Sequence, residues 1–256
     1  MHKTVAALNA RQPAYFSCTY GAGGSTQENT LATVDWLREQ NIDSAPHLTC
    51  IGNTSEETIA LLQRYKEQGI HRIVALRGDR PSGSGASIGD MSYANELVAL
   101  IRKHFADHFH IEVAAYPEMH PQADNLISDI ENFKRKVDAG ANAAITQYFY
   151  NVDAYTHFVD LCEKMGISIP IVPGIMPITN YSNLVRFSDM CGAEIPRWIR
   201  KRLEAYADDI DSIRAFGTEV VTRQCERLLA AGAPGLHFYT MNQSAPTLKL
   251  WDNLGL

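Results

Sequence analysis

The 256-residue sequence lacks the features that mark several large classes of protein. No apolar run approaches the roughly 20 residues that a membrane-spanning helix needs, and residues 1–13 contain no apolar segment of signal-peptide length. Basic residues form no cluster, and the net charge of -6 argues against nucleic acid or an anionic membrane as the main partner. We therefore expect a cytoplasmic protein with neither kind of partner.

The sequence also lacks the spacings of a metal site or a disulfide framework. Its five cysteines are odd in number and scattered, and none forms a Cys-x-x-Cys pair; they are Cys18, Cys50, Cys162, Cys191 and Cys225. Such a pattern is typical of reduced thiols in a cytoplasmic protein. Carboxylates and histidines show no ligand spacing either, so no metal is expected.

What the chain does have is a regular alternation of apolar segments and amphipathic stretches. Seven segments are predicted to be strands, at 15–20, 45–50, 73–79, 111–116, 143–148, 169–173 and 236–240. Ser25-x-x-Glu28 and Thr54-x-x-Glu57 predict capping boxes at two helix starts, and helices fill roughly 181–230. The pattern indicates one α/β domain over 1–256, a (β/α)8-type TIM barrel with seven of its eight strands evident.

Two glycine clusters invite a nucleotide-binding interpretation. Residues 21–26, Gly-Ala-Gly-Gly-Ser-Thr, lie between a strand and a helix as a Rossmann turn does, but Thr26 stands at the third glycine position. The next strand also ends without the acidic residue that holds a ribose. A Rossmann site is therefore disfavoured, and the second cluster, at 83–85, is interpreted as a mobile loop.

Polar residues gather where the predicted strands end. The strand at 73–79 runs through four apolar residues into Arg77, Gly78 and Asp79, and an ordinary turn with an internal ion pair is the alternative to a site. With parallel strands, one rim carries Thr19, Tyr20, His47, Arg77, Asp79, Tyr116, Glu118, His120, Gln147, Thr240 and Asn242. A histidine in such a set is often structural. No lysine lies at a strand end, so the rim suits an enzyme whose reactive atoms belong to an organic cofactor.

Seven blocks carry a resemblance to a known family. They are Ala-Pro-His-Leu-Thr-Cys (45–50), Ala-Leu-Arg-Gly-Asp (75–79), Ala-Ala-Tyr-Pro-Glu-x-His-Pro (114–121), Lys-Arg-Lys-Val-Asp-Ala-Gly-Ala (134–141), Ile-Thr-Gln-Tyr-Phe (145–149), Pro-Gly-Ile-x-Pro (173–177) and His-Phe-Tyr-Thr-x-Asn (237–242). In this order they resemble the bacterial type of methylenetetrahydrofolate reductase, a flavin-dependent (β/α) barrel of one-carbon metabolism and methionine biosynthesis. The resemblance implies that NAD(P)H reduces bound FAD, which then reduces 5,10-methylenetetrahydrofolate to 5-methyltetrahydrofolate in a ping-pong reaction.

The resemblance also implies roles for individual residues. Asp79 and Gln147 would be catalytic, and Gln147, Asn183 and Phe187 would bind the folate, Phe187 as a stacking ring. Thr19 would lie near the nicotinamide nucleotide. The FAD would be held by Tyr20, Ala22, His47, Arg77, Gly78, Asp79, Tyr93, Ala94, Tyr116, His120, Ala123, Asp129, Asn132, Arg135 and Lys136. For the stripe of Asp129, Asn132 and Lys136, an ordinary solvated helix face is the alternative.

Two departures from the family pattern bear on function. Gln243 stands where family members often carry Arg, which puts in doubt how the folate tail is held. The family's first strand, whose Glu is the general acid, has no counterpart, so we expect a truncated member with an impaired folate half-reaction. A flavin- or folate-binding protein without turnover and an unrelated barrel lyase are the alternatives, and a homo-oligomer is expected.

Overall fold

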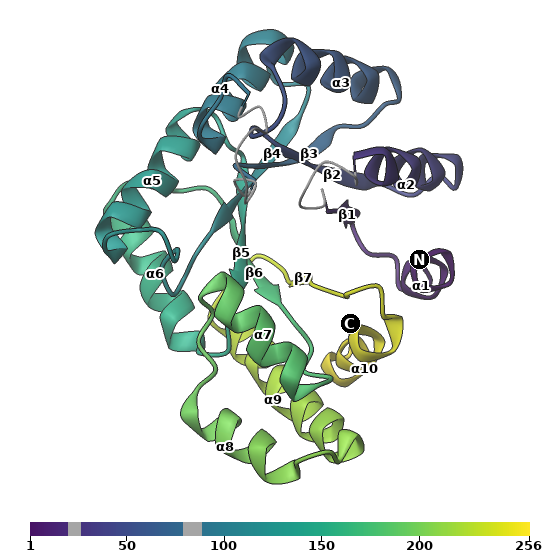
Figure 1. Cartoon of the computed structure of the whole chain (residues 1–256), viewed down its shortest axis with the longest axis vertical. Helices are drawn as coiled ribbons and strands as arrows, with labels where there is room; N and C mark the ends of the chain where they lie inside the picture. The colour runs from purple at the N-terminus through teal and green to yellow at the C-terminus, as the bar shows by residue number, and fades with distance from the viewer. Residues whose placement is uncertain (20–26, 79–88) are drawn as a thin grey trace. The chain divides into compact units, whose positions relative to one another are not determined.

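The computed structural model describes residues 1–19, 27–78 and 89–256 (Figure 1). Three expected site residues, Tyr20, Ala22 and Asp79, lie outside the described residues, as do both glycine clusters and Ser25 of the first predicted capping box. The described residues form two compact units. We call residues 12–114 and 132–144 the amino-terminal unit, and residues 1–11, 115–131 and 145–256 the carboxyl-terminal unit.

The amino-terminal unit is built from parallel strands that alternate with helices. Its elements are β1 (Phe16–Cys18), α2 (Gln27–Glu39), β2 (Ser44–Thr49), α3 (Ser55–Glu67), β3 (Arg72–Leu76), α4 (Ala94–Phe105) and β4 (His110–Ala115). The pairs β1–β2, β2–β3 and β3–β4 are all parallel. The apolar run Ile73, Val74 and Ala75 is fully buried, as expected for a strand covered on both faces.

The carboxyl-terminal unit continues the same alternation. Helix α5 (Leu126–Asp138) and strand β5 (Ala143–Tyr148) contribute residues to both units, and α6 (Val152–Lys164), β6 (Ile171–Ile175), α7 (Tyr181–Cys191), α8 (Arg197–Tyr206), α9 (Ile210–Ala230), β7 (His237–Phe238) and α10 (Ser244–Leu254) follow. Strands β6 and β7 are parallel, with Gly174 opposite His237. Among the described helices, none is both long and apolar enough to cross a bilayer.

Helix α1 (His2–Asn9) is an element that the sequence pattern did not predict. Two polar contacts fix it to the other end of the chain. The Thr4 hydroxyl donates to the Asn242 carbonyl at 2.9 Å, and Arg11 pairs with Asp252 of α10 at 2.5 Å. Because these contacts join residues nearly the whole chain apart, no local pattern could have revealed them.

The seven described strands follow one another in chain order within the sheet, β1 through β7. A strand, a helix and then a parallel neighbouring strand is the repeating unit of a (β/α) barrel. The predicted α/β class of (β/α)-barrel type and the seven predicted strands are therefore confirmed. The second predicted capping box is confirmed as well, since Thr54 Oγ1 accepts from Glu57 N at 3.2 Å and Glu57 Oε2 from Thr54 N at 2.8 Å.

Arg102, in the last turn of α4, is the main polar anchor of the amino-terminal unit. Its guanidinium donates to the carbonyls of Ala106, Phe109 and Gly140 and to Asn142 Oδ1, at 2.5 to 2.9 Å. The helix α4 and the turn that precedes β5 are thus joined through one side chain. Burial lowers the pKa of Arg102, but this guanidinium stays charged at physiological pH.

Replacing Arg102 should therefore be costly. We expect Arg102→Ala to lower the free energy of unfolding by about 2–4 kcal/mol, because several part-buried acceptors lose their donor at once. Arg223→Ala is the matched control, since Arg223 pairs with Glu219 on the exposed surface of α9 and should change stability by about 0.5 kcal/mol or less. Urea unfolding of both variants measures the difference, and equal losses would contradict the assigned role.

Candidate functional site

In the amino-terminal unit, the carboxyl ends of β2 and β3 lie together. The ladder extends past both strands, with Cys50 N donating to Leu76 O and Ile51 N to Arg77 O, each at 3.1 Å. Gly78 follows and lies against the Thr49 side chain. Arg77 and Gly78 thus lie at the strand edge where the sequence placed them. His47 does not, because it lies within β2, two residues before the strand ends.

The starts of α3 and α4 lie at the same edge. Asp90, in the turn before α4, accepts from Ser55 N at the first residue of α3 at 3.1 Å. Glu96 accepts from Tyr93 N at 3.0 Å and so caps α4, whose first residue is Ala94. Carboxylates therefore already occupy both helix starts where the strands end, and they offset the positive ends of α3 and α4. The Tyr93 side chain is 57% exposed beside them.

The end of β1 and the polar face of α5 carry the remaining candidates of this unit. Thr19 follows β1, and its carbonyl accepts from the Thr30 hydroxyl of α2 at 3.0 Å. On α5, Arg135 donates to Asn132 Oδ1 at 2.6 Å and both residues are exposed, while Lys136 donates to the Ala114 carbonyl at 2.6 Å. The guanidinium of Arg135 is the group on this face best suited to a phosphate.

In the carboxyl-terminal unit, the segment after β4 folds back on itself. The rings of Tyr116 and His120 meet edge to face, 4.5 Å between centroids, and His120 Nδ1 accepts from Gln122 N at 3.0 Å. Asp129 accepts from His120 N at 2.8 Å, and Ala123 N donates to His120 O at 2.9 Å. The buried Asp129 is therefore a structural acceptor here, and the predicted stripe that joined it to Asn132 and Lys136 is not one exposed face.

The carboxyl ends of β5, β6 and β7 converge in the same unit on Thr146. Its hydroxyl accepts from Gly174 N and its carbonyl from the Tyr239 hydroxyl, both at 2.9 Å. A Cβ on Gly174 would lie 2.2 Å from Thr146 O and 2.6 Å from the Tyr239 ring, so only glycine allows this approach. Tyr239 was part of a recognised block but was not predicted to have this role.

Gln147 follows Thr146 and is half-buried among buried neighbours. Its Oε1 accepts from Tyr148 N at 3.0 Å, which fixes the orientation of the amide. The Tyr148 hydroxyl lies 3.1 Å from Ser188 Oγ and so joins β5 to α7. Asn183 and Phe187 are spaced four apart on α7, so they lie on one face of that helix.

Glu118 is a residue that the sequence placed at the rim without assigning it a function. Its Oε2 accepts from Glu194 N at 2.8 Å, while Oε1 is buried without a hydrogen-bond partner among the described residues. Burial, together with the nearby charge of Glu194, raises the pKa of Glu118 to about 7, against the weaker opposing effect of the Glu194 N–H. The adjacent Tyr148 also has a raised pKa, chiefly through burial.

The family model for methylenetetrahydrofolate reductase matches residues 1–255. The 5,10-methylenetetrahydrofolate reductase of Escherichia coli is 39% identical over 250 residues, covering 97% of this chain and 83% of the relative. That of Buchnera aphidicola subsp. Schizaphis graminum is 40% identical over 257 residues, covering 100% and 86%.

The chain belongs to the methylenetetrahydrofolate reductase family. It is therefore an oxidoreductase, and the resemblance drawn from the seven sequence blocks is confirmed. A solved structure from Clostridium thermocellum, described as an uncharacterized protein that binds two copies of 5-methyl-5,6,7,8-tetrahydrofolic acid, has the same fold. Its TM-score is 0.60 at 14% identity, with 94% of this chain and 95% of that chain covered.

Some of the described candidates lie at a strand end, and the others lie on helices or in the segments before them. The structure brings Arg77, Gly78, Tyr93 and Ala94 to one edge of the amino-terminal unit. In the carboxyl-terminal unit, it joins Tyr116 to His120 and places Gln147 at the end of β5. Their roles in binding stay predictions.

The raised pKa of Glu118 predicts a pH dependence of the reductase's stability. Between its ordinary value of 4.5 and about 7, the unfolded carboxyl is ionised while the folded one keeps its proton. The stability contributed by Glu118 is thus present below pH 4.5 and lost as pH rises to about 7. We expect Glu118→Gln to remove this loss. Between pH 5 and pH 8, the free energy of unfolding of the variant should rise by about 1–2 kcal/mol relative to that of the wild type, after solvent screening.

Denaturant unfolding at both pH values measures that difference, with Glu219→Gln as the control because Glu219 lies exposed on α9. If the wild type and Glu118→Gln follow parallel curves of stability against pH, Glu118 does not titrate as described.

The packing at Gly174 gives a third stability prediction. Gly174→Ala should destabilise the protein by about 3 kcal/mol, because the added methyl meets a backbone carbonyl and a held ring. Gly235→Ala is the matched control, since its methyl would meet no described atom within 4 Å. Thermal unfolding followed by circular dichroism measures both, and a tolerated alanine at 174 would show that the three strand ends separate easily.

Proposed function

We propose that this chain reduces 5,10-methylenetetrahydrofolate to 5-methyltetrahydrofolate, with bound FAD as the hydride carrier and NAD(P)H as the reductant in a ping-pong cycle. The observation that carries the proposal is family membership over residues 1–255 at about 40% identity to named reductases. A folate is also what the Clostridium thermocellum protein of the same fold is described as binding. The strand ends support it too, since they offer hydrogen-bonding groups and no lysine.

Each unit, considered by itself, has described residues that suit one part of a flavin dinucleotide. The amino-terminal unit has the exposed Arg135 on α5, whose guanidinium suits a phosphate of the dinucleotide. The carboxyl-terminal unit presents the Tyr116 and His120 rings. When bound, FAD would supply two-electron chemistry, accepting hydride from NAD(P)H and passing it to the folate.

The residues that would hold FAD are those assigned by resemblance. The described ones are His47, Arg77, Gly78, Tyr93, Ala94, Tyr116, His120, Ala123, Asp129, Asn132, Arg135 and Lys136, with Thr19 beside the nicotinamide. His47 and Asp129 would position neighbouring residues and not touch FAD themselves. His47 lies within β2, and Asp129 is buried against the His120 N–H. Asp79 would place a negative charge near the reacting rings.

Gln147 is the described residue best placed to recognise the pterin. Since its Oε1 accepts from Tyr148 N, the amide is turned so that its NH2 group is the end left for a ligand. Thr146 and Tyr148 on either side are held to β6, β7 and α7, so Gln147 stands on a fixed support. Phe187 and Asn183 on α7 would add a stacking ring and an amide.

The proposal is tested by following the flavin through two separate half-reactions. The purified chain should show the absorption of oxidised FAD, lose it when NADH or NADPH is added without oxygen, and regain it when 5,10-methylenetetrahydrofolate follows. A colourless protein, or one that NAD(P)H does not reduce, would refute the proposal. Flavin that is reduced but not reoxidised would restrict the chain to the first half-reaction.

Gln147→Ala separates the folate step from the flavin step. We expect reoxidation by 5,10-methylenetetrahydrofolate to slow by about tenfold or more, because one directed hydrogen bond to the substrate is lost. Reduction by NAD(P)H should change less, since it precedes folate binding. Gln122→Ala, on the exposed segment before α5, is the control. Equal slowing of both steps would argue against a pterin contact at Gln147.

A further inference from the structure

Three polar side chains of the carboxyl-terminal unit form a cluster that the proposed function does not use. We call Glu118, Tyr148 and Ser188 the Glu118 cluster. The Tyr148 hydroxyl lies 3.1 Å from Ser188 Oγ, and Glu118 Oε2 accepts from Glu194 N, in the turn after α7, at 2.8 Å. Burial chiefly raises the pKa of Tyr148, and the nearby charge of Glu118 adds to that effect. The cluster thus joins the segment after β4 to β5 and α7.

Each member of the Glu118 cluster is a close neighbour in sequence of a residue that is predicted to bind a ligand. The neighbouring pairs are Gln147 and Tyr148, Phe187 and Ser188, and Tyr116 and Glu118. Successive residues of a strand point to opposite faces, so Gln147 and Tyr148 lie on opposite sides of β5. The cluster therefore lies behind the predicted contacts and supports them.

The segment that carries Glu118 is itself held from the side of α5. Asp129 accepts from His120 N at 2.8 Å, and Ala123 N donates to His120 O at 2.9 Å. On its other side, a Cβ on Gly192 would lie 2.7 Å from Pro121 Cγ, so the left-handed glycine that ends α7 lies directly on this segment. The end of α7 is thus placed by contacts with a segment that α5 already fixes.

The carboxyl of Glu118 suits this junction in its neutral form. Its Oε1 is buried and has no hydrogen-bond partner among the described residues, so a negative charge there would lack a donor. The described titratable groups around it are the negative Glu194 and the neutral Tyr148, with Cys191 at the end of α7 beside Tyr148. Burial raises the pKa of Glu118 to about 7. Ionisation would favour a carboxylate that moves toward water and away from the turn after α7.

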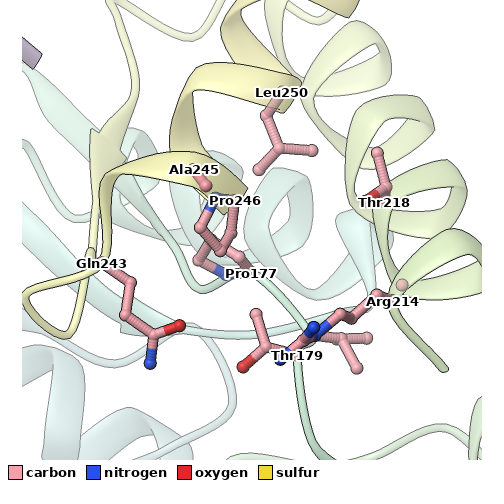
Figure 2. Close-up of a pocket in the computed structure, with 10 residues that line it drawn as sticks. Pro177, Thr179, Arg214, Thr218, Gln243, Ala245, Pro246 and Leu250 are labelled. Carbon is pink, nitrogen blue, oxygen red and sulfur yellow. The ribbon is translucent and has the colours of Figure 1, made fainter. Parts of the chain in front are cut away.

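The cluster does not line the cavity of the same unit. This cavity, of about 300 Å³, lies between the end of β6, helix α9 and the start of α10, and Arg214 and Gln243 are among its lining residues (Figure 2). Its floor is the segment after β6, from Pro177 to Thr179. None of the ten lining residues belongs to the Glu118 cluster. A ligand in this cavity would therefore respond to the cluster only through the residues that the cluster supports.

We propose that Glu118 is a positioning residue for the folate: by holding the turn after α7 and packing beside Tyr148, it fixes where Gln147 and Phe187 lie. The inference rests on the proposed function, since the folate and these two contacts are named there. Ionisation of Glu118 loosens the support, so the affinity for folate should be highest in acid and fall as the pH rises through about 7. By linkage, folate binding near that pH should draw a proton onto Glu118.

The probe is 5-methyltetrahydrofolate, titrated calorimetrically into the purified full chain without oxygen. Any flavin is reduced beforehand, so that no hydride transfer follows binding. The dissociation constant of the wild type should rise about fivefold or more between pH 6 and pH 8.5. At pH 7, binding should take up protons, which is measured as a dependence of the heat on the ionisation enthalpy of the buffer. Glu118→Gln keeps the shape but cannot ionise, so it should show neither effect. Glu219→Gln, exposed on α9, is the matched control and should follow the wild type.

A purely structural role for Glu118 would change the affinity equally at both pH values. The inference is therefore overturned if the wild type and Glu118→Gln lose the same affinity over this range, or if the proton uptake persists in Glu118→Gln and so belongs to another group. Binding of the probe by the wild type with no pH dependence refutes the inference alone. A wild type that does not bind the probe at either pH refutes the proposed function, and the inference with it.

Discussion

The close approach of three strand ends at Thr146 is the constraint on which the carboxyl-terminal unit depends. One residue accepts from a backbone N–H of β6 and from the tyrosine that follows β7, and Gly174 leaves no room for any other side chain between them. This contact also fixes where the neighbouring residues lie. Gln147 follows Thr146 directly, and the cavity floor begins a few residues beyond Gly174. A rigid support of this kind is what a binding or catalytic site requires.

The two units differ in how their carboxyl groups are hydrogen-bonded. In the amino-terminal unit, the helix starts at the strand edge are capped by Asp90, Glu96 and Glu57, whose carboxylates accept from backbone N–H groups. In the carboxyl-terminal unit, Glu118 is buried with one oxygen unpartnered among the described residues. A carboxyl placed so is costly to ionise, and its raised pKa expresses that cost. The Glu118 carboxyl therefore keeps its proton to a higher pH than a solvated carboxyl would.

Local pattern was enough to predict the parts of the fold that depend on local physics. Strand β5 covers the predicted residues 143–148, and the box at Thr54 caps α3 as its spacing indicates. Contacts between distant segments could not be predicted from the sequence. Helix α1 is held by residues of α10 and of the turn before it, His47 lies inside its strand, and Asp129 turns inward to the His120 backbone. Each of these depends on how segments pack, which periodicity does not encode.

The replacement at position 243 shows why a family pattern and a structure must be considered together. By resemblance to the family, an Arg is expected at position 243, and Gln243 leaves the side chain after the last strand uncharged. The cavity is bounded by a second element, however, and α9 directs Arg214 toward the side where Gln243 lies. The charge of the cavity walls therefore depends on α9 as well as on the residue that follows the last strand.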